Sequence, residues 1–243
     1  MAGAQSAPYR PGNLFDRLSS AETRELHYAH AEAREQQLLA RRLPLAGGEV
    51  LSVGCGWNPG RHLFPAPAFR MVAVDSDAER VAGVLETGRA EEAFVGEAGS
   101  LPLADGRFDV VLYRLVLHHI AYQGPLTSCF AEAARLLKPG GALVAVEPGR
   151  WHPVGALLAL ANARGGTVAT ALHGTPDDIP LSPRVLAHQS LHAGLRPELH
   201  AVTYTWRRLP AAVQRAVQPL DALGSRPRAA PFAHTLMLIA RKP

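Results

Sequence analysis

Short apolar runs alternate with helix-favouring stretches along most of the chain. The runs are almost continuously apolar, a pattern typical of strands buried on both faces of a parallel sheet. We predict strands at residues 48–54, 69–75, 90–96, 107–115 and 141–148. We predict helices at roughly 77–87, 125–137, 154–163 and 184–193. Strands that alternate with helices in this way favour an α/β fold, in which helices cover both faces of the sheet.

Both ends of the chain add elements to this pattern. Residues 21–43 are dense in Ala, Glu, Arg, Gln and Leu, and Ser20 precedes them as a suitable N-cap, so we predict a helix there. Residues 200–206 and 233–241 are predicted to form two further strands joined by a longer connection. No internal repeat or low-complexity linker divides the sequence, which favours a single domain.

The composition is that of a folded, water-soluble chain. Of the 243 residues, 47% are apolar and 19% are charged, which argues against intrinsic disorder. No apolar run approaches the roughly 20 residues that a membrane span needs. The N-terminal MAGAQSAPYRPG lacks the apolar segment of a secretory signal. Cys55 and Cys129 have no metal-type spacing, so we expect a reducing, cytoplasmic location and no membrane partner.

Positive charge is concentrated at the C-terminal end. The whole chain carries a formal net charge of +4, but residues 201–243 hold seven basic residues against Asp221 alone. Such a segment can contact phosphates or acidic substrates, or it can form a solvated face. No aromatic platform is interleaved with these arginines, which argues against single-stranded nucleic acid as a partner.

The stretch LSVGCGWNPGRHLF, residues 51–64, carries the first candidate site. An apolar strand ends there in Gly54 and Gly56, and glycine lets the backbone approach a ligand without an intervening Cβ. Asp75 ends the next predicted strand, twenty-one residues after Gly54, where a carboxylate would hold ribose hydroxyls. A strand, a glycine loop leading toward a helix and this carboxylate together predict a nucleotide site at the carboxyl ends of the strands.

Pro59 restricts which nucleotide can bind. The dinucleotide fingerprint has its third glycine at this position, and proline cannot donate a backbone hydrogen bond to a pyrophosphate. A ligand without phosphates, which needs mainly close approach at the first two glycines, suits the loop better. Pro59 therefore argues against an NAD-dependent dehydrogenase.

Four motifs in their order and spacing resemble the class I S-adenosylmethionine-dependent methyltransferases, in particular the group called methyltransferase type 11. They are VLSVGCG, VAVDSDAERV, VGEAGSLPLADGRFDVVLYRLVLHHI and EAARLLKPGGALVAVEP. The resemblance implies S-adenosylmethionine as cofactor and a Rossmann-like, seven-stranded, mostly parallel sheet with an antiparallel last strand. The single domain would then comprise an N-terminal helical cap, a cofactor-binding core, a substrate or lid region and C-terminal strands, at residues 1–47, 48–148, 149–198 and 199–243.

The resemblance also implies which residues contact the cofactor. The glycine loop would lie under the methionine and ribose parts, and the acid after the second strand would take the ribose hydroxyls beside the adenine. The loop after the third strand would meet the adenine, and the end of the fourth strand would offer backbone carbonyls to the methionine ammonium. In that order the residues are Gly54, Cys55 and Gly56; Asp75 and Ser76; Glu97 and Ala98; and Tyr113, Arg114 and Leu115.

The sequence departs from the family pattern in three places. Ser52 stands where the family usually has an acidic residue, and Glu97 is one methylene longer than the usual aspartate. Asn58 and Pro59 displace the third glycine and lengthen the loop. We therefore expect either weaker cofactor binding or a methionine end held elsewhere, for which the Arg114 side chain is a candidate.

Candidates for catalysis follow the fourth and fifth predicted strands. Methyl transfer needs positioning and, for a hydroxyl or amine acceptor, sometimes a general base. His118 and His119 follow the fourth strand and Glu147 ends the fifth, although each can instead pack or order its loop. Tyr113 is a candidate for orienting the substrate, and His152 is a candidate for contacting it. The histidines lie without cysteine or carboxylate sets, so we expect no metal.

We predict an enzyme that methylates O, N or C of a small-molecule acceptor. The stretch WHPVGALLALANARGG, residues 151–166, can line an apolar acceptor pocket or form a homodimer face. One alternative is an RNA methyltransferase that uses the basic C-terminal segment. Against it, LHHI follows the fourth strand in place of an Asn-Pro-Pro-aromatic motif. The other alternative is a non-catalytic binding protein of the same fold, which Ser52 and the altered loop suggest.

Overall fold

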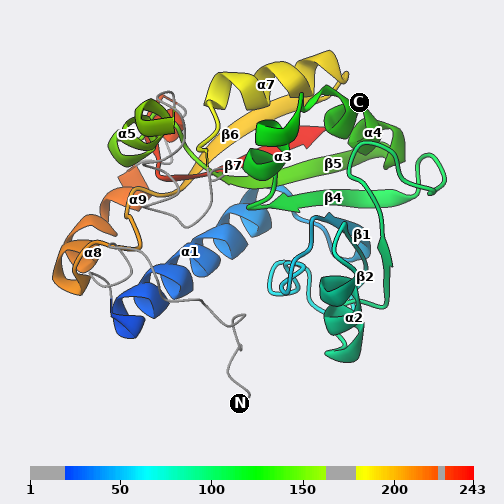
Figure 1. The fold of residues 1–243 in the computed structure, drawn as a ribbon, viewed down its shortest axis with the longest axis horizontal. Coiled ribbons are helices and arrows are strands. Elements are labelled where there is room, and N and C mark those ends of the chain that lie inside the picture. The colour runs from blue at the N-terminus through cyan, green and yellow to red at the C-terminus, as the bar shows by residue number, and fades with distance from the viewer. Residues whose placement is uncertain (1–19, 163–178, 224–227) are drawn as a thin grey trace.

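The computed structural model describes residues 20–162, 179–223 and 228–243. Its centre is a seven-stranded sheet with the order β3-β2-β1-β4-β5-β7-β6 (Figure 1). The pairs among β1 to β5 are parallel, whereas β7 is antiparallel to both of its neighbours. This confirms the predicted α/β fold and its antiparallel last strand. The strands are β1 Gly48–Val53, β2 Phe69–Asp75, β3 Glu92–Val95, β4 Phe108–Arg114, β5 Leu137–Pro148, β6 Arg196–Thr203 and β7 Thr235–Arg241.

Helices cover both faces of the sheet, while α5, α8 and α9 gather beyond the carboxyl ends of the parallel strands (Figure 1). Leu51 and Val111 pack in a core with residues of α3, α4 and α7, and the adjacent Val50 and Val110 pack in a second core with α1 and α2. This alternation is the period-2 pattern of a strand buried on both faces. The helices are α1 Ala21–Arg42, α2 Ala78–Glu86, α3 Leu117–Gln123, α4 Thr127–Leu136, α5 Pro153–Asn162, α7 Pro183–His192, α8 Ala211–Val217, α9 Leu220–Leu223 and the 3-10 helix η2 Ala230–Phe232.

The connection between β1 and β2, residues 54–68, contains turns and no helix. The expectation that the glycine loop leads into a helix is therefore wrong. Prolines at positions 59, 65 and 67 explain the difference, because each removes a backbone donor and disfavours helical geometry in the residue before it. Leu63 and Phe64 from this connection join the core that contains Leu39 of α1, so α1 and the connection together cover this part of the sheet.

The first helix forms as its sequence predicts. The Ser20 hydroxyl accepts a hydrogen bond from the Thr23 backbone N–H at 3.1 Å, which satisfies one of the free donors at the helix start. Ala31, Leu38 and Leu39 are buried against the sheet. The same helix buries Glu35, a charged residue whose partner lies at the end of β4.

β5, β6 and α3 are among the elements that differ from the prediction. β5 begins at Leu137, because Leu137 already pairs with Phe108; the Pro-Gly-Gly segment follows as an irregularity in the register before Ala142 pairs with Val110. β6 covers Arg196–Thr203 instead of 200–206, since its first half is an edge strand with polar, exposed positions. α3 was not predicted, and its N-terminus depends on a side chain from β5.

No helix within the described ranges has the length and apolarity to cross a bilayer.

Candidate functional site

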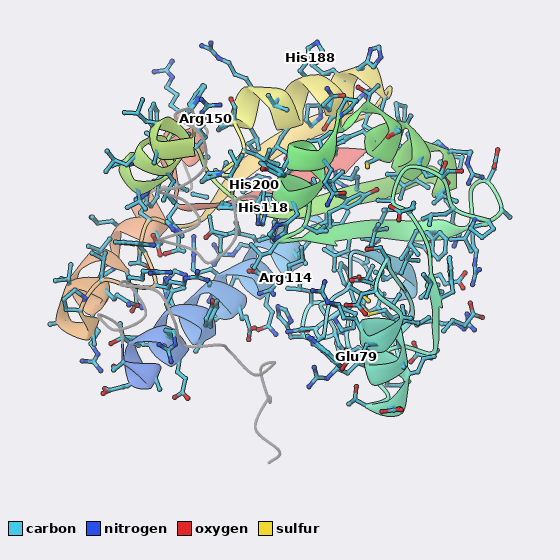
Figure 2. All side chains as sticks on the ribbon, in the orientation of Figure 1. Glu79, Arg114, His118, Arg150, His188 and His200 are labelled. Carbon is cyan, nitrogen blue, oxygen red and sulfur yellow. The ribbon has the colours of Figure 1, made fainter. Side chains whose placement is uncertain are left out.

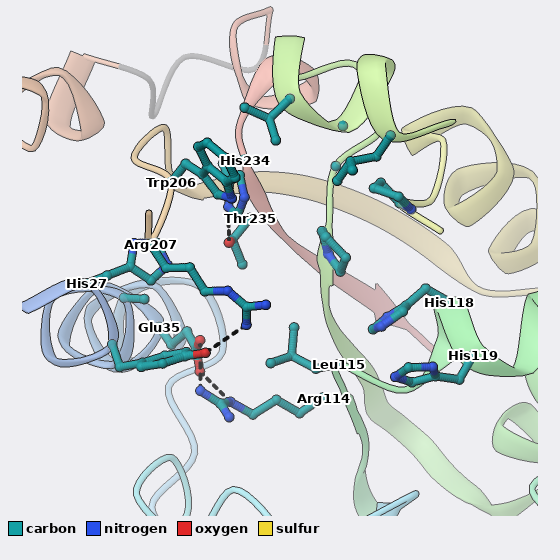
Figure 3. Close-up of a pocket in the computed structure, with 18 residues that line it drawn as sticks. His27, Glu35, Arg114, Leu115, His118, His119, Trp206, Arg207, His234 and Thr235 are labelled. Carbon is teal, nitrogen blue, oxygen red and sulfur yellow. Dashed lines mark hydrogen bonds and ion pairs between the residues drawn. The ribbon is translucent and has the colours of Figure 1, made fainter. Parts of the chain in front are cut away.

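A cavity of about 260 Å³ lies at the carboxyl ends of β4 and β5 (Figure 3). Its walls come from α1, the start of α3, the β5–α5 segment and the residues just before β7. In open α/β sheets this edge is where ligands bind. Val154, Gly155 and Leu158 of α5 line it, which favours the pocket interpretation of this stretch. Six lining residues carry aromatic rings: His27, Tyr28, His118, His119, Trp206 and His234.

His118 and Glu147 form a buried pair at one wall of this cavity. His118 Nδ1 lies 2.6 Å from Glu147 Oε2, and both side chains are almost completely buried. Glu147 Oε1 accepts hydrogen bonds from the backbone N–H groups of Val116 and Leu117, at 3.0 and 2.8 Å. These are donors that the first turn of α3 cannot satisfy itself, and the positive end of a helix favours a carboxylate. Glu147 thus orders the start of α3 and orients the His118 ring.

This arrangement separates the roles of the three catalytic candidates. His118 and His119 line the cavity, with ring centroids 4.0 Å apart, whereas Glu147 is fully buried behind His118. A carboxylate that already accepts two N–H groups requires the proton on His118 Nδ1, which makes Nε2 the basic nitrogen. Glu147 is consequently a positioning residue, and the prediction that it acts as a base is wrong because it is not exposed to the cavity.

The backbone at the end of β4 adopts an uncommon conformation. Leu115 has φ 56°, in the left-handed region that non-glycine residues seldom occupy, and it lines the cavity. Such conformations cost about 1–3 kcal/mol and concentrate at functional sites. The Leu115 N–H donates to the Val146 carbonyl at 2.8 Å, which holds the strained residue beside β5.

The glycine loop and Asp75 come together as the sequence predicts. Gly54 and Gly56 have φ values of 64° and 51°. Asp75 Oδ2 accepts a hydrogen bond from the Gly56 N–H at 2.8 Å, and Oδ1 accepts one from the Asp77 N–H at 3.1 Å. A carboxylate offers about four lone-pair positions, so Asp75 can fix the loop and still accept ribose hydroxyls. Cys55 between the glycines is buried, and burial raises the pKa of its thiol to about 12.

The residues predicted to meet adenine lie at the ends of β2 and β3. The Gly96 N–H donates to the Asp75 carbonyl at 3.0 Å, which places Glu97 and Ala98 next to the end of β2. Ser76 and Glu97 are exposed, and Ala98 is partly buried. An open carboxylate beside the Asp75 backbone fits the amino group of an adenine better than it fits a phosphate.

Tyr113 does not face the cavity. Its side chain is 1% exposed, and its hydroxyl donates to the Cys129 carbonyl at 3.1 Å. Only its backbone can contact a ligand, so the prediction that it orients the substrate is wrong. The neighbouring Arg114 side chain does line the cavity, but Glu35 of α1 holds its guanidinium, with Arg114 Nε 2.9 Å from Glu35 Oε2. The Arg114 side chain is therefore turned toward α1 and not toward the glycine loop.

Several cavity residues were not predicted from the sequence, among them Glu35, Trp206 and Arg207. Figure 2 places Arg114 and His118 near the centre of the molecule, where α1 meets the end of the sheet. Glu35 on a charged helix resembles any solvated residue, and Arg207 resembles any residue of the basic C-terminal segment. The predicted substrate residue His152 does not line the cavity. Its ring packs edge-on against that of His234, which does line the cavity, with the two ring centroids 5.2 Å apart.

His27 should make stability depend on pH. Burial, aided by the charge of Arg207, lowers the pKa of His27 from 6.5 to about 4. The unfolded chain therefore binds a proton that the folded chain excludes, and stability falls as the pH drops from about 6.5 to about 4. Because of His27, we expect the free energy of unfolding, measured in urea, to fall by about 2 kcal/mol between pH 7 and pH 5. His27→Gln should reduce this loss while exposed His192→Gln keeps it; equal losses in both variants would contradict the assignment.

Comparison with known proteins finds similarity to S-adenosylmethionine-dependent methyltransferases. The family described as "Methyltransferase domain" matches residues 51–145, which run from β1 into β5. A probable S-adenosylmethionine-dependent methyltransferase from Mycolicibacterium smegmatis is 35% identical over 114 residues, and a protein from Streptomyces fradiae is 36% identical over 110 residues. The chain spans 42% and 30% of the lengths of these two proteins. A demethylmenaquinone methyltransferase from Parafrankia is 29% identical over 90% of this chain and 97% of its own length.

Solved structures show the same fold. A methyltransferase from Thermotoga maritima, described as a possible histamine N-methyltransferase, superposes with a TM-score of 0.63 at 16% identity, over 91% of this chain and 94% of its own. Phosphoethanolamine N-methyltransferase 2 from Haemonchus contortus, solved with S-adenosyl-L-methionine, superposes with a TM-score of 0.57 at 16% identity, over 87% of this chain and 52% of its own.

Proposed function

The chain belongs to the class I S-adenosylmethionine-dependent methyltransferases, and we propose that it methylates a small-molecule acceptor in the cavity beside His118. The His118–Glu147 pair carries this proposal, because it places an oriented imidazole in the cavity wall at the end of β4. When bound, S-adenosylmethionine supplies an electrophilic methyl group. His118 Nε2 accepts the proton that an acceptor hydroxyl or amine loses, and Glu147 stabilises the resulting imidazolium.

The residues of this chain fit the cofactor. A Cβ added at Gly56 meets no atom of the described residues within 4 Å, so this backbone faces open space where close approach is possible. Gly54, Cys55 and Gly56 would support the methionine and ribose, and Asp75 would accept the ribose hydroxyls. Glu97, with Ala98 and Ser76, would meet the adenine. The backbone of Tyr113 and Arg114 would face the methionine end.

Gly56→Ala should weaken cofactor binding. A left-handed alanine costs about 1–2 kcal/mol, and its methyl group would project toward the cofactor. We expect the affinity for S-adenosylhomocysteine, measured by calorimetry, to fall about tenfold, which corresponds to about 1.4 kcal/mol. NAD should not bind.

Gly88→Ala is the matched control. Gly88 has φ 62°, and a Cβ added there also meets nothing within 4 Å in the described part of the chain, but it follows α2 and is not part of the glycine loop. It should carry the same backbone penalty and leave binding unchanged. Equal binding by the two variants would place the cofactor elsewhere. Gly54→Ala should instead destabilise the fold, since its Cβ would lie 2.2 Å from Val116 Cγ2.

The activity itself is tested by release of S-adenosylhomocysteine. Purified protein is incubated with S-adenosylmethionine and a panel of phenols, hydroxybenzoates, amines and, because one relative carries that name, demethylmenaquinol analogues. Product formation is confirmed by mass spectrometry. Cofactor binding without turnover of any compound would favour a non-catalytic binding protein.

A small acceptor is favoured over RNA by the places of the basic C-terminal residues. Arg207 lines the cavity, and Arg208 is buried against the Trp206 ring. Lys242 follows the end of β7 and donates to two backbone carbonyls, at Ala134 and at Leu137 where β5 begins. These charges are distributed over both ends of the sheet. Salt-sensitive RNA binding by the purified protein would revive the RNA alternative.

A further inference from the structure

The glycine loop closes through the segment 57–59, Trp-Asn-Pro, and not through a helix. Where a helix follows such a loop, its backbone hydrogen bonds hold the residues after the glycines, but residues 54–68 contain turns and no helix. The Asn58 N–H donates to the Cys55 carbonyl at 3.2 Å, and the Gly60 N–H donates to Asn58 Oδ1 at 3.1 Å. Both bonds lie within the loop, so they do not connect it to neighbouring elements.

The indole ring of Trp57 makes such a connection, because it packs directly on Gly83 of α2. A Cβ added at Gly83 would lie 2.4 Å from Trp57 Cζ3 and 3.0 Å from Cε3. The ring therefore occupies the space that any larger residue at this position would fill. Glycine is unfavourable in the interior of a helix, and the close approach of the ring gives a reason for it here. The connection between β1 and β2 thus lies against α2 (Figure 1).

A second contact ties the backbone of Trp57 to the same region. Arg89 donates from Nη1 to the Trp57 carbonyl. The Arg89 N–H in turn donates to the Val84 carbonyl of α2 at 3.0 Å. Trp57 is consequently held at its ring by α2 and at its carbonyl by a residue that follows α2.

A third contact joins the loop to the start of α2. Asp75 Oδ2 accepts a hydrogen bond from the Gly56 N–H at 2.8 Å, and Oδ1 accepts one from the N–H of Asp77, the N-cap of α2, at 3.1 Å. Gly56 is the residue whose backbone faces open space. It therefore lies between a carboxylate that contacts the start of α2 and, one residue later, a ring that packs on the middle of the same helix.

Resting on the proposed function, we propose that Trp57 is a positioning residue for the cofactor, which holds the backbone of Gly56 in place by packing on Gly83. Trp57 acts through the loop and not by contact with the cofactor. A loop that is ordered before binding loses less conformational entropy when its ligand binds. The contact with α2 takes the role of the helix that does not follow the glycine loop in this chain.

Substitutions of Trp57 test this role through the affinity for S-adenosylhomocysteine, measured by calorimetry, with urea unfolding of each variant alongside. Trp57→Ser removes the ring, and because ordering a single loop residue on binding costs roughly tenfold in affinity, we expect a loss of about that size. Trp57→Phe retains a ring that can pack on Gly83 and should keep most of the affinity. Leu85→Ser is the control, since Leu85 is a large apolar residue of the same helix with 43% exposure, close to the 37% of Trp57. It should leave the affinity unchanged.

Gly83→Ala tests the contact without altering the loop sequence. Alanine is the better helix former, but its Cβ would displace the indole ring, so the affinity should fall although the helix itself is favoured. Because both substitutions act on one contact, the double variant, Trp57→Ser with Gly83→Ala, should bind no more weakly than Trp57→Ser alone. If Trp57→Ser does not fold, Gly83→Ala still decides, since it retains Trp57.

Each other outcome overturns the proposal in a recognisable way. Normal affinity in Trp57→Ser or in Gly83→Ala, or additive losses in the double variant, would reject the positioning role and leave the methyltransferase function standing. A loss of stability without a loss of affinity would make Trp57 a structural residue only. Equal losses in Trp57→Ser and Trp57→Phe would assign the indole to direct contact with the cofactor. If the unaltered protein does not bind S-adenosylhomocysteine, the proposed function fails, and the positioning role fails with it.

Discussion

Replacing His118 with asparagine is expected to lower kcat by about 10²–10⁴-fold, the contribution typical of a positioned general base. The asparagine amide can donate to Glu147, as His118 Nδ1 does at 2.6 Å, so the buried carboxylate keeps a partner. Asparagine has no group that titrates near neutral pH, so the rising limb of the kcat–pH profile should disappear as well. The rate is measured with the phenol or hydroxybenzoate that gives the fastest release of S-adenosylhomocysteine.

The neighbouring histidine is the control for this prediction. His119 lines the same cavity, with its ring 4.0 Å from that of His118, but Glu147 orients only His118. His119→Asn should therefore change kcat less than tenfold, by the same estimate for general-base catalysis, and keep the pH profile. Both variants should bind S-adenosylhomocysteine normally. A His118→Asn enzyme with full kcat and an unchanged pH profile would show that methyl transfer here needs only positioning.

Glu147→Gln tests whether Glu147 stabilises a protonated His118 or only orders the start of α3. It removes the charge that stabilises a protonated His118 but can still accept from Val116 and Leu117. The variant should keep its cofactor affinity and shift the rising limb of the kcat–pH profile to lower pH, because the imidazole holds its proton less well without the carboxylate. A fall in kcat without any shift of the profile would indicate that Glu147 only orders α3.

The geometry of the proposed cofactor half could be predicted because it depends on short, local signals. A glycine after a buried strand and an aspartate after the next strand are read from neighbouring residues, and parallel pairing then brings Gly56 and Asp75 together. His118 was found for the same reason, since it follows β4. The acceptor half was predicted less well. Glu35 and Arg207 come from opposite ends of the chain, and only tertiary packing makes them neighbours of Arg114 and Tyr28.

The errors in the fold have the same origin. The strands β1, β2 and β4 were predicted closely because burial on both faces makes them continuously apolar. The short helix α3 contains no local cap, and its first N–H groups are satisfied by Glu147 from another strand. In residues 54–68, by contrast, the local signal was present in the sequence. Three prolines were visible in the sequence, yet the pattern of a glycine loop before a helix was given more weight than their steric effect.

The largest loss of stability is expected from Glu35→Leu. Glu35 is 2% exposed and binds Arg114 through Oε1 and Oε2, while His62 Nε2 lies 3.3 Å from Oε2. Burial would raise the pKa of Glu35, but the charge of Arg114 and the hydrogen bonds from His62 and Arg114 hold it below its usual 4.5. Removing one member of a buried ion pair costs about 3–5 kcal/mol, because the other charge remains in a low dielectric. Urea unfolding at pH 7 measures this loss.

The same argument predicts that a second substitution, at the partner of Glu35, restores the stability that Glu35→Leu removes. Replacing both members, in Glu35→Leu with Arg114→Met, leaves no buried charge and should recover most of the lost stability, as apolar replacements of buried pairs often do. Exposed Glu25→Gln on the same helix should change the unfolding free energy by less than about 0.5 kcal/mol. Because the folded pKa of Glu35 is lowered, the stabilisation is present above about pH 4.5 and is lost as the pH falls through the folded value. A double variant that is less stable than Glu35→Leu alone would show that Arg114 stabilises the fold through contacts other than this pair.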